Sequence, residues 1–126
     1  MKVEIKRDGL TLRGDFVKPQ TDKFNLVILM HGFTSNRGIE PSQLLYQLAQ
    51  RFVAEGLGTL RFDFNGHGES DGRFQDMTVL NEIADGKAIL DYARSLEGVE
   101  NIYLLGHSQG GVVASMLAGY YPEKNR

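Results

Sequence analysis

The feature that most limits how this chain can fold is the repeated order of an apolar run, a turn-rich loop and a segment with helical spacing. The apolar runs occupy residues 24–30, 58–64 and 101–106, and the helical segments follow at 44–52, 80–93 and 110–120. Unbroken apolar runs are typical of strands that are covered on both faces. Strands joined by crossovers of this length run parallel. The order therefore predicts the α/β class, with a mostly parallel sheet and flanking helices on both faces.

The N-terminal segment has a different, alternating pattern. Apolar residues stand at Val3 and Ile5, the chain turns at 8–9, and the alternation resumes at Leu10 and Leu12. This pattern predicts an antiparallel hairpin with one buried face. The chain has 126 residues, which sets one domain as the upper limit, so we expect 1–126 to lie in a single domain.

Composition and charge exclude several classes of function. A net charge of -2 and a pI near 5.9 provide no basic surface for nucleic acid. The aliphatic run 26–30 is far shorter than the ~20 residues that cross a bilayer, and the charged N-terminus lacks the apolar core of a signal peptide. The sequence contains no cysteine, which fits a reducing compartment. We expect a cytoplasmic protein with no nucleic-acid or membrane partner.

All three histidines follow the predicted central strands. His31, His67 and His107 stand in the loops after those strands. Ligands of open α/β sheets bind outside the carboxyl ends of the strands, so these loops mark the candidate site. Because no cluster of histidines or carboxylates has the spacing of metal ligands, we expect neither a metal nor a cofactor.

The loop after the last predicted strand carries the clearest catalytic pattern. Residues 106–110 read Gly-His-Ser-Gln-Gly, which fits the Gly-x-Ser-x-Gly turn that projects a serine hydroxyl above the sheet. An apolar strand leads into this turn, and a small-residue helix at 111–115 leads out of it. The glycines let the backbone turn sharply and let the helix pack close to the strands. We predict that Ser108 is a nucleophile; a purely structural turn is the alternative.

A nucleophilic serine also needs donors for the negative charge that develops on the substrate oxygen. The residue after the serine supplies one backbone N–H, and the loop after the first central strand supplies another. In this sequence those positions are Gln109 and Phe33. We expect their two amides to form an oxyanion hole, which acts without reorganising during the reaction.

The glycine-rich loop at 65–73 invites a nucleotide-binding interpretation, which its spacing does not support. Gly66, Gly68 and Gly72 give G-x-G-x-x-x-G rather than G-x-G-x-x-G, and no helix opens directly after them. Asp63 and Asp71 border this loop. We expect their carboxylates to bond the local backbone as turn and capping groups rather than to act in catalysis.

Two histidines near the candidate nucleophile need separate interpretation. His107 directly precedes Ser108, and adjacent residues at a strand end point to opposite sides, so we expect a packed side chain that faces away from the serine. His67 is the upstream histidine that could lie at the same end of the sheet as Ser108 and act as its general base, although we expect it not to do so.

Three segments together resemble the α/β-hydrolase fold, and within it the bacterial cinnamoyl (feruloyl) esterases. They are His-Gly-Phe-Thr at 31–34, the Arg-Phe-Asp-Phe-Asn-Gly-His-Gly-Glu-Ser-Asp-Gly segment at 61–72, and Gly-His-Ser-Gln-Gly-Gly at 106–111. The resemblance implies that Ser108 forms the acyl-enzyme and that Phe33 and Gln109 hold the oxyanion. It also implies small hydroxycinnamate esters as substrates. Carboxylesterases, monoacylglycerol lipases and proline-type peptidases share this turn, so a lipase or peptidase of the same fold is an alternative.

The sequence departs from the α/β-hydrolase pattern after the serine. In this fold the catalytic groups follow the order Ser, Asp or Glu, His, yet residues 109–126 contain neither histidine nor aspartate. The resemblance thus implies the N-terminal portion of one hydrolase domain, an incomplete α/β-hydrolase fold. We expect the 126-residue chain alone to be inactive. The missing base also keeps open a non-catalytic module that binds a ligand or a partner protein.

The predicted strand 102–105 lies in the middle of the sheet in a complete fold of this type. Here it becomes an apolar edge with unpaired backbone groups. We therefore expect the chain to form a homodimer, to self-associate, or to pair with the missing C-terminal half.

Overall fold

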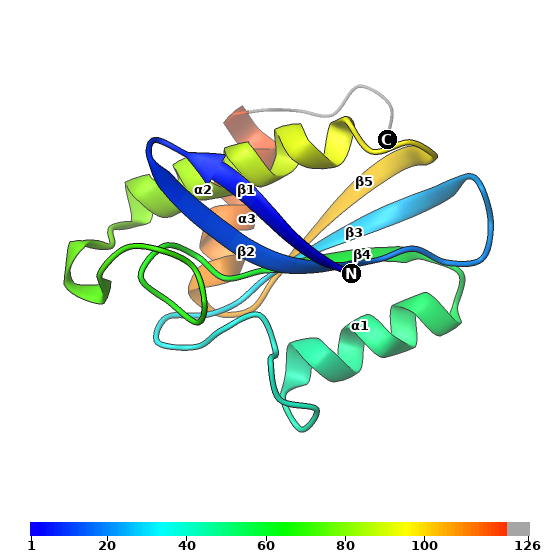
Figure 1. The fold of residues 1–126 in the computed structure, drawn as a ribbon, viewed down its shortest axis with the longest axis horizontal. Helices are drawn as coiled ribbons and strands as arrows, with labels where there is room; N and C mark the ends of the chain where they lie inside the picture. The colour runs from blue at the N-terminus through cyan, green and yellow to red at the C-terminus, as the bar shows by residue number, and fades with distance from the viewer. Residues whose placement is uncertain (121–126) are drawn as a thin grey trace.

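The computed structural model describes residues 1–120 and contains five strands, three α-helices and one short 3-10 helix (Figure 1). The strands are β1 (Lys2–Arg7), β2 (Leu10–Val17), β3 (Phe24–Met30), β4 (Gly58–Phe62) and β5 (Val99–Gly106). The helices are α1 (Leu44–Ala54), the 3-10 helix η1 (Phe74–Asp76), α2 (Val79–Arg94) and α3 (Gln109–Tyr120).

The strands form one sheet in the order β1-β2-β4-β3-β5. β3 lies between β4 and β5 and is parallel to both, whereas β2 is antiparallel to β1 and to β4. The α/β class and the N-terminal hairpin are thus confirmed. Because β3, β4 and β5 run in one direction, their carboxyl ends open at the same end of the sheet.

Helices cover both faces of the sheet, as predicted (Figure 1). On one face, Leu45 of α1 packs against Val27 and Leu29 of β3. On the other face, α2 and α3 pack on alternate residues of the same strand, including Leu26 and Ile28. The apolar run at 24–30 is continuous because β3 contributes to two cores at once.

Two strand boundaries and one short helix differ from the sequence prediction. β4 ends at Phe62 instead of residue 64, because the Asp63 carboxylate turns into the molecule and accepts the backbone amides of Arg37 and Glu69. β5 begins at Val99, since that residue pairs with Phe24. The 3-10 helix η1 was not predicted, as one turn leaves no periodic pattern.

Within residues 1–120, β5 pairs with β3 and forms an edge of the sheet. Tyr103 on this strand is 46% exposed. The apolar edge expected from the sequence is therefore present. Its use by a second copy of the chain or by further strands stays a prediction.

In the part of the chain that the structure describes, no helix has the length and apolar character needed to span a membrane. The same residues contain no group of three or more histidines and carboxylates arranged to hold a metal ion.

Candidate active site

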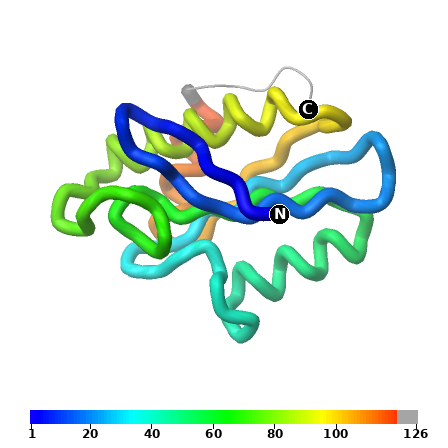
Figure 2. Tube along the Cα trace, viewed as in Figure 1, coloured from blue at the N-terminus to red at the C-terminus, as the bar shows by residue number. Residues whose placement is uncertain are grey.

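The loops that follow β3, β4 and β5 meet at one end of the sheet (Figure 2). The Thr34 amide donates to Nε2 of His67 across 3.3 Å, which joins the first loop to the second. Gly32 faces Ser108 so closely that a side-chain carbon at position 32 would lie 3.1 Å from the serine Cβ. The structure thus brings together the three segments that the sequence marked as the candidate site.

Ser108 sits on a strained turn between β5 and α3. Its φ is 58°, a left-handed conformation that costs a non-glycine residue of the order of 1–3 kcal/mol and persists only where its surroundings impose it. The turn is held by backbone bonds on both sides, from the His107 amide to the Met30 carbonyl and from the Gly111 amide to the Ser108 carbonyl. The side chain of Ser108 is exposed. This is the turn that the Gly-x-Ser-x-Gly pattern predicted.

The glycines of this motif are required by close backbone packing. A Cβ on Gly106 would overlap the backbone of Gly110, and a Cβ on Gly110 would overlap the carbonyls of Met30 and His31. The first turn of α3 therefore lies directly against the end of β5 and the end of β3. Only residues without a side chain allow this approach.

The two predicted oxyanion donors belong to the two loops that meet at Ser108, where Gly32 faces the serine. Gln109 is the first residue of α3, so its backbone N–H has no partner within the helix. Among residues 1–120, the Phe33 amide also donates no hydrogen bond, while the neighbouring amide of Thr34 is taken by His67. Backbone N–H groups without partners are the kind of donor that stabilises a tetrahedral oxyanion. Their role in catalysis stays a prediction.

Both upstream histidines are built into the loops. Nε2 of His31 accepts the Phe64 amide across 3.1 Å, and Nδ1 lies 2.7 Å from the Gly32 carbonyl. In His67, Nε2 accepts the Thr34 amide and Nδ1 lies 3.0 Å from the Asn65 carbonyl. A backbone N–H can only donate, so both rings are neutral with the proton on Nδ1. Their lone pairs are thus used to hold the loops and are not free to take a proton from Ser108.

Burial makes the His31 ring resistant to protonation. The side chain is 1% exposed, and this burial lowers the pKa of His31 to about 4, although the hydrogen bond to the Gly32 carbonyl acts in the opposite direction. His31 therefore stays neutral near pH 7, as its acceptance of the Phe64 amide requires.

A buried ionic cluster holds the loop that carries Phe33. The guanidinium of Arg37, 2% exposed, donates to the carboxylates of Asp15, Asp63 and Glu69. Burial by itself lowers the pKa of Arg37, but the bonds to Asp15 and Glu69 and the charge of Asp63 raise it above its ordinary value. Arg61 adds a second guanidinium, which donates to the carbonyl of Arg37.

The structure corrects the expected surroundings of the two aspartates near the glycine-rich loop. Asp63 is fully buried and bonds Arg37 as well as the amide of Glu69 in its own loop. Asp71 accepts the amide of Thr11 and the guanidinium of Arg13 on strand β2. Both are structural, as predicted, but distant segments rather than a local turn supply most of their partners.

The expectation for His107 is wrong in one respect. Its side chain is exposed rather than packed, since residue 107 lies beyond the end of β5 at Gly106. His107 lines a pocket of about 170 Å³ together with residues of the first loop and the start of α1, among them Gly32, Ser35 and Leu44.

An aromatic group surrounds the Phe33 side of the site. Phe33 and Phe74 are 50% and 43% exposed, and their ring centroids lie 5.2 Å apart. His67 contacts both rings, with centroids 6.4 Å from Phe33 and 5.4 Å from Phe74. We call Phe33, His67 and Phe74 the aromatic shelf. Its two half-exposed phenylalanine rings offer an apolar surface at the residue of one predicted oxyanion donor.

Sequence reasoning missed two buried acids behind the site. Glu82 on α2, 1% exposed, accepts the side-chain amide of Gln109 across 2.8 Å. Asp85, one turn further along α2, accepts the backbone and side-chain amides of Asn65 and the guanidinium of Arg7. The one signal in the sequence is that both carboxylates fall on the apolar face of the predicted helix, beside Ile83 and Ile89.

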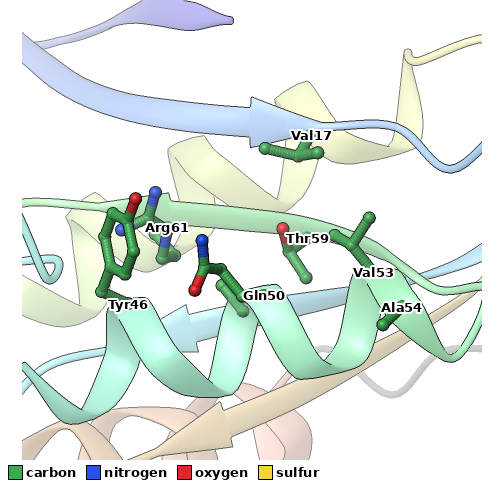
Figure 3. Close-up of a pocket in the computed structure, with 8 residues that line it drawn as sticks. Val17, Tyr46, Gln50, Val53, Ala54, Thr59 and Arg61 are labelled. Atoms are coloured by element: carbon green, nitrogen blue, oxygen red, sulfur yellow. The ribbon is translucent and has the colours of Figure 1, made fainter. Parts of the chain in front are cut away.

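A larger pocket, of about 440 Å³, lies between α1, β4 and the end of β2. Figure 3 shows Tyr46 and Gln50 extending from α1 toward Arg61 and Thr59 of β4. Burial lowers the pKa of Arg61. Its guanidinium lies over the Tyr46 ring, 5.2 Å from the ring centroid. The residues that line this pocket include neither Ser108 nor the two oxyanion donors, so it is separate from the candidate active site.

Comparison with known proteins agrees with this geometry. The family model described as serine aminopeptidase, S33, matches residues 21–126. Est1E from Butyrivibrio proteoclasticus, solved with ferulic acid bound, is 35% identical and superposes with a TM-score of 0.88 over 94% of this chain. The Pyrococcus furiosus esterase Pf2001 is 31% identical, with a TM-score of 0.82 over 98% of the chain. A monoacylglycerol lipase of Mycolicibacterium smegmatis is 30% identical over 115 residues, which is 90% of the chain.

The chain spans less than half the length of these relatives. It covers 47% of the Est1E chain, 48% of the Pf2001 chain and 39% of the monoacylglycerol lipase. The likeness thus extends along nearly the whole of this chain and about half of each relative.

Proposed function

Because this chain belongs to the α/β-hydrolase family described as serine aminopeptidase, S33, we propose that it carries the nucleophile and oxyanion hole of a serine hydrolase that cleaves carboxylic esters. The observation that carries the proposal is the left-handed, exposed Ser108, since among residues 1–120 the amides of Phe33 and Gln109 in the adjoining loops donate no hydrogen bond. A strained conformation of this kind is kept where it serves a function.

In the proposed reaction, Oγ of Ser108 attacks the carbonyl carbon of the ester while a base takes its proton. The carbonyl oxygen becomes an oxyanion, which the amides of Phe33 and Gln109 stabilise. Collapse of this intermediate breaks the ester bond, and the alcohol leaves with the proton returned by the base. Water then attacks the acyl-enzyme, releases the acid and restores Ser108.

The base is not one of the two buried histidines, because Nε2 of both His31 and His67 accepts a backbone amide. Family members place the catalytic acid and histidine after the serine in chain order. Because residues 109–126 contain no histidine, we propose that the catalytic histidine lies outside residues 1–126, in a longer form of the protein or in a partner chain.

Hydroxycinnamate esters are the proposed substrate class. Two observations support them: the likeness to Est1E, whose structure holds ferulic acid, and the aromatic shelf beside the oxyanion hole. The ring of a hydroxycinnamoyl group can pack on Phe33 and Phe74, since aromatic rings favour offset-stacked or edge-to-face contacts with one another.

Covalent labelling tests the nucleophile. We expect a fluorophosphonate probe to label the natural-length protein, and the Ser108→Ala variant to lose both labelling and hydrolysis of 4-nitrophenyl acetate and methyl ferulate while keeping its unfolding temperature. Turnover that survives Ser108→Ala would remove the assignment. The 126-residue chain, assayed beside the natural-length protein, should be inactive, because it lacks the base.

Glyceride esters are the second candidate substrate class, favoured by the 30% identity to the monoacylglycerol lipase. A panel of methyl ferulate, 4-nitrophenyl esters and monoacylglycerols separates the two classes by kcat/KM. A non-catalytic binding module, which the occupied histidines favour, predicts instead that the natural-length protein is not labelled by the fluorophosphonate.

A further inference from the structure

Glu82 is a buried acid with a single hydrogen-bond partner. It lies in the first turn of α2 and is 1% exposed. Among the described residues, the carboxylate accepts one hydrogen bond, from Nε2 of Gln109 across 2.8 Å, and no lysine or arginine pairs with it. Burial raises the pKa of Glu82, while the hydrogen bond from Gln109 acts in the opposite direction. A carboxyl group in this position is costly to bury, and an apolar residue would suit the core better.

The partner of Glu82 is the residue whose backbone amide is the proposed oxyanion donor. Gln109 follows the strained Ser108 and begins α3, so no earlier turn of helix holds it. Its side chain reaches from this exposed turn to the interior face of α2, where Sδ of Met77 also lies 4.0 Å from Nε2. The hydrogen bond to Glu82 therefore ties the free first residue of α3 to a second helix.

Helix α2 is a firm support for this tie. Thr78 caps its N-terminus in a capping box with Asn81, one turn before Glu82. Further along, Gly86 lets α3 approach closely, since a Cβ at this position would overlap the side chain of Leu117. The capping box and the close packing of Gly86 against Leu117 thus fix the part of α2 that carries Glu82 relative to α3.

We infer that Glu82 is a positioning residue of the oxyanion hole: by holding the side-chain amide of Gln109, it keeps the backbone N–H of Gln109 directed at the reacting carbonyl oxygen. The inference rests on the proposed function. It assigns Glu82 no contact with the substrate, so its effect passes entirely through Gln109.

Steady-state kinetics of the natural-length protein with 4-nitrophenyl acetate test the inference. Losing a whole oxyanion donor typically costs ~10²–10³ in rate, and a loosened donor should cost less. We expect Glu82→Ala to lower kcat about tenfold with KM within about twofold of wild type. Glu82→Gln, whose amide oxygen still accepts from Gln109, should stay within about threefold in kcat. Asp91→Ala is the matched control, because Asp91 is a carboxylate on the exposed side of the same helix.

A double-mutant cycle separates positioning from general destabilisation. If Glu82 acts through the Gln109 side chain, then Glu82→Ala has no further effect once Gln109→Ala is present, and the double variant loses about tenfold rather than about a hundredfold. Additive losses would overturn the inference. So would a Glu82→Gln variant as slow as Glu82→Ala, or a loss confined to KM.

NMR spectroscopy gives a result that does not depend on turnover. The side-chain amide signals of Gln109, identified by their absence in Gln109→Ala, should move in Glu82→Ala and stay in place in Asp91→Ala. If the wild-type protein shows no Ser108-dependent hydrolysis, the proposed function fails, and these signals still decide whether Glu82 holds Gln109. Unchanged signals in Glu82→Ala would overturn the inference even in an active enzyme.

Discussion

The two sides of the candidate oxyanion hole are built by different physical means. On the Phe33 side, the first loop is held by charges and imidazoles, with Arg37 bonded to three carboxylates and His31 accepting a backbone amide. On the Gln109 side, the turn is held by direct backbone contact, which the glycines at 106 and 110 make possible. We call these the charged side and the packed side.

The difference has a consequence for stability. Buried ion pairs stabilise the fold only while every partner is present. Removing one partner leaves a buried charge unpaired and strongly lowers the free energy of unfolding. Close backbone packing requires glycines without side chains, so it is disrupted when a substitution adds a side-chain carbon rather than when one removes a group. The two sides should therefore fail in response to different substitutions and conditions.

The largest expected effect is on the charged side. Arg37→Leu leaves Asp63, which is fully buried, without its cation, and we expect it to lower the free energy of unfolding by about 3–5 kcal/mol. Urea denaturation of the natural-length protein measures this change. Arg51→Leu is the matched control, because Arg51 is exposed and its ion pair with Glu55 spans 3.7 Å, and it should change stability by less than about 1 kcal/mol.

A second variant sharpens this result. Adding Asp63→Asn to Arg37→Leu removes the uncompensated charge and should recover part of the loss. A double variant less stable than Arg37→Leu alone would mean that Asp63 stabilises the loop through its backbone partners rather than through Arg37.

The next effect is on the packed side. Gly110→Ala adds a Cβ that would overlap the carbonyls of Met30 and His31, and we expect it to lower the free energy of unfolding by about 3 kcal/mol. It should also reduce kcat, since the amide of Gln109 moves with the turn. Thermal and urea unfolding, with the esterase assay, measure both effects.

The same helix provides the control. Gly119 also lies on α3, and a Cβ there meets no described atom within 4 Å. Gly119→Ala should raise stability by about 0.5–1 kcal/mol, because alanine favours the helix. Equal losses at the two glycines would show that helix propensity, not backbone contact, governs the turn.

The same contrast explains which parts of the site the sequence reveals. The packed side requires glycines at fixed distances from Ser108, so its constraint is local and appears as a readable motif. The α/β class and the strand that supplies two cores were likewise predictable, since apolar periodicity reflects burial directly.

The charged side left no such motif. Arg37 is bonded to Asp15, Asp63 and Glu69, and only the folded topology of β2, β3 and β4 brings these residues together. Most arginines in loops are exposed, so nothing in the sequence indicates that Arg37 is buried. Glu82 was missed for the same reason, because its one partner lies 27 positions away in the chain.

The smallest effect is the pH dependence that His31 contributes on the charged side. His31 is neutral in the folded protein, where burial lowers its pKa to about 4, and its pKa in the unfolded chain is about 6.5. As the pH falls below 6.5 the unfolded chain gains a proton that the folded protein does not take up, so folded stability decreases until the pH passes 4. Between pH 7 and pH 5 this linkage should cost about 2 kcal/mol. Urea denaturation at several pH values should therefore show that the free energy of unfolding depends more steeply on pH in wild type than in His31→Gln. NMR titration checks the cause directly, because a His31 ring that titrates near pH 6.5 in the folded protein would show that its bond from the Phe64 amide does not hold it neutral.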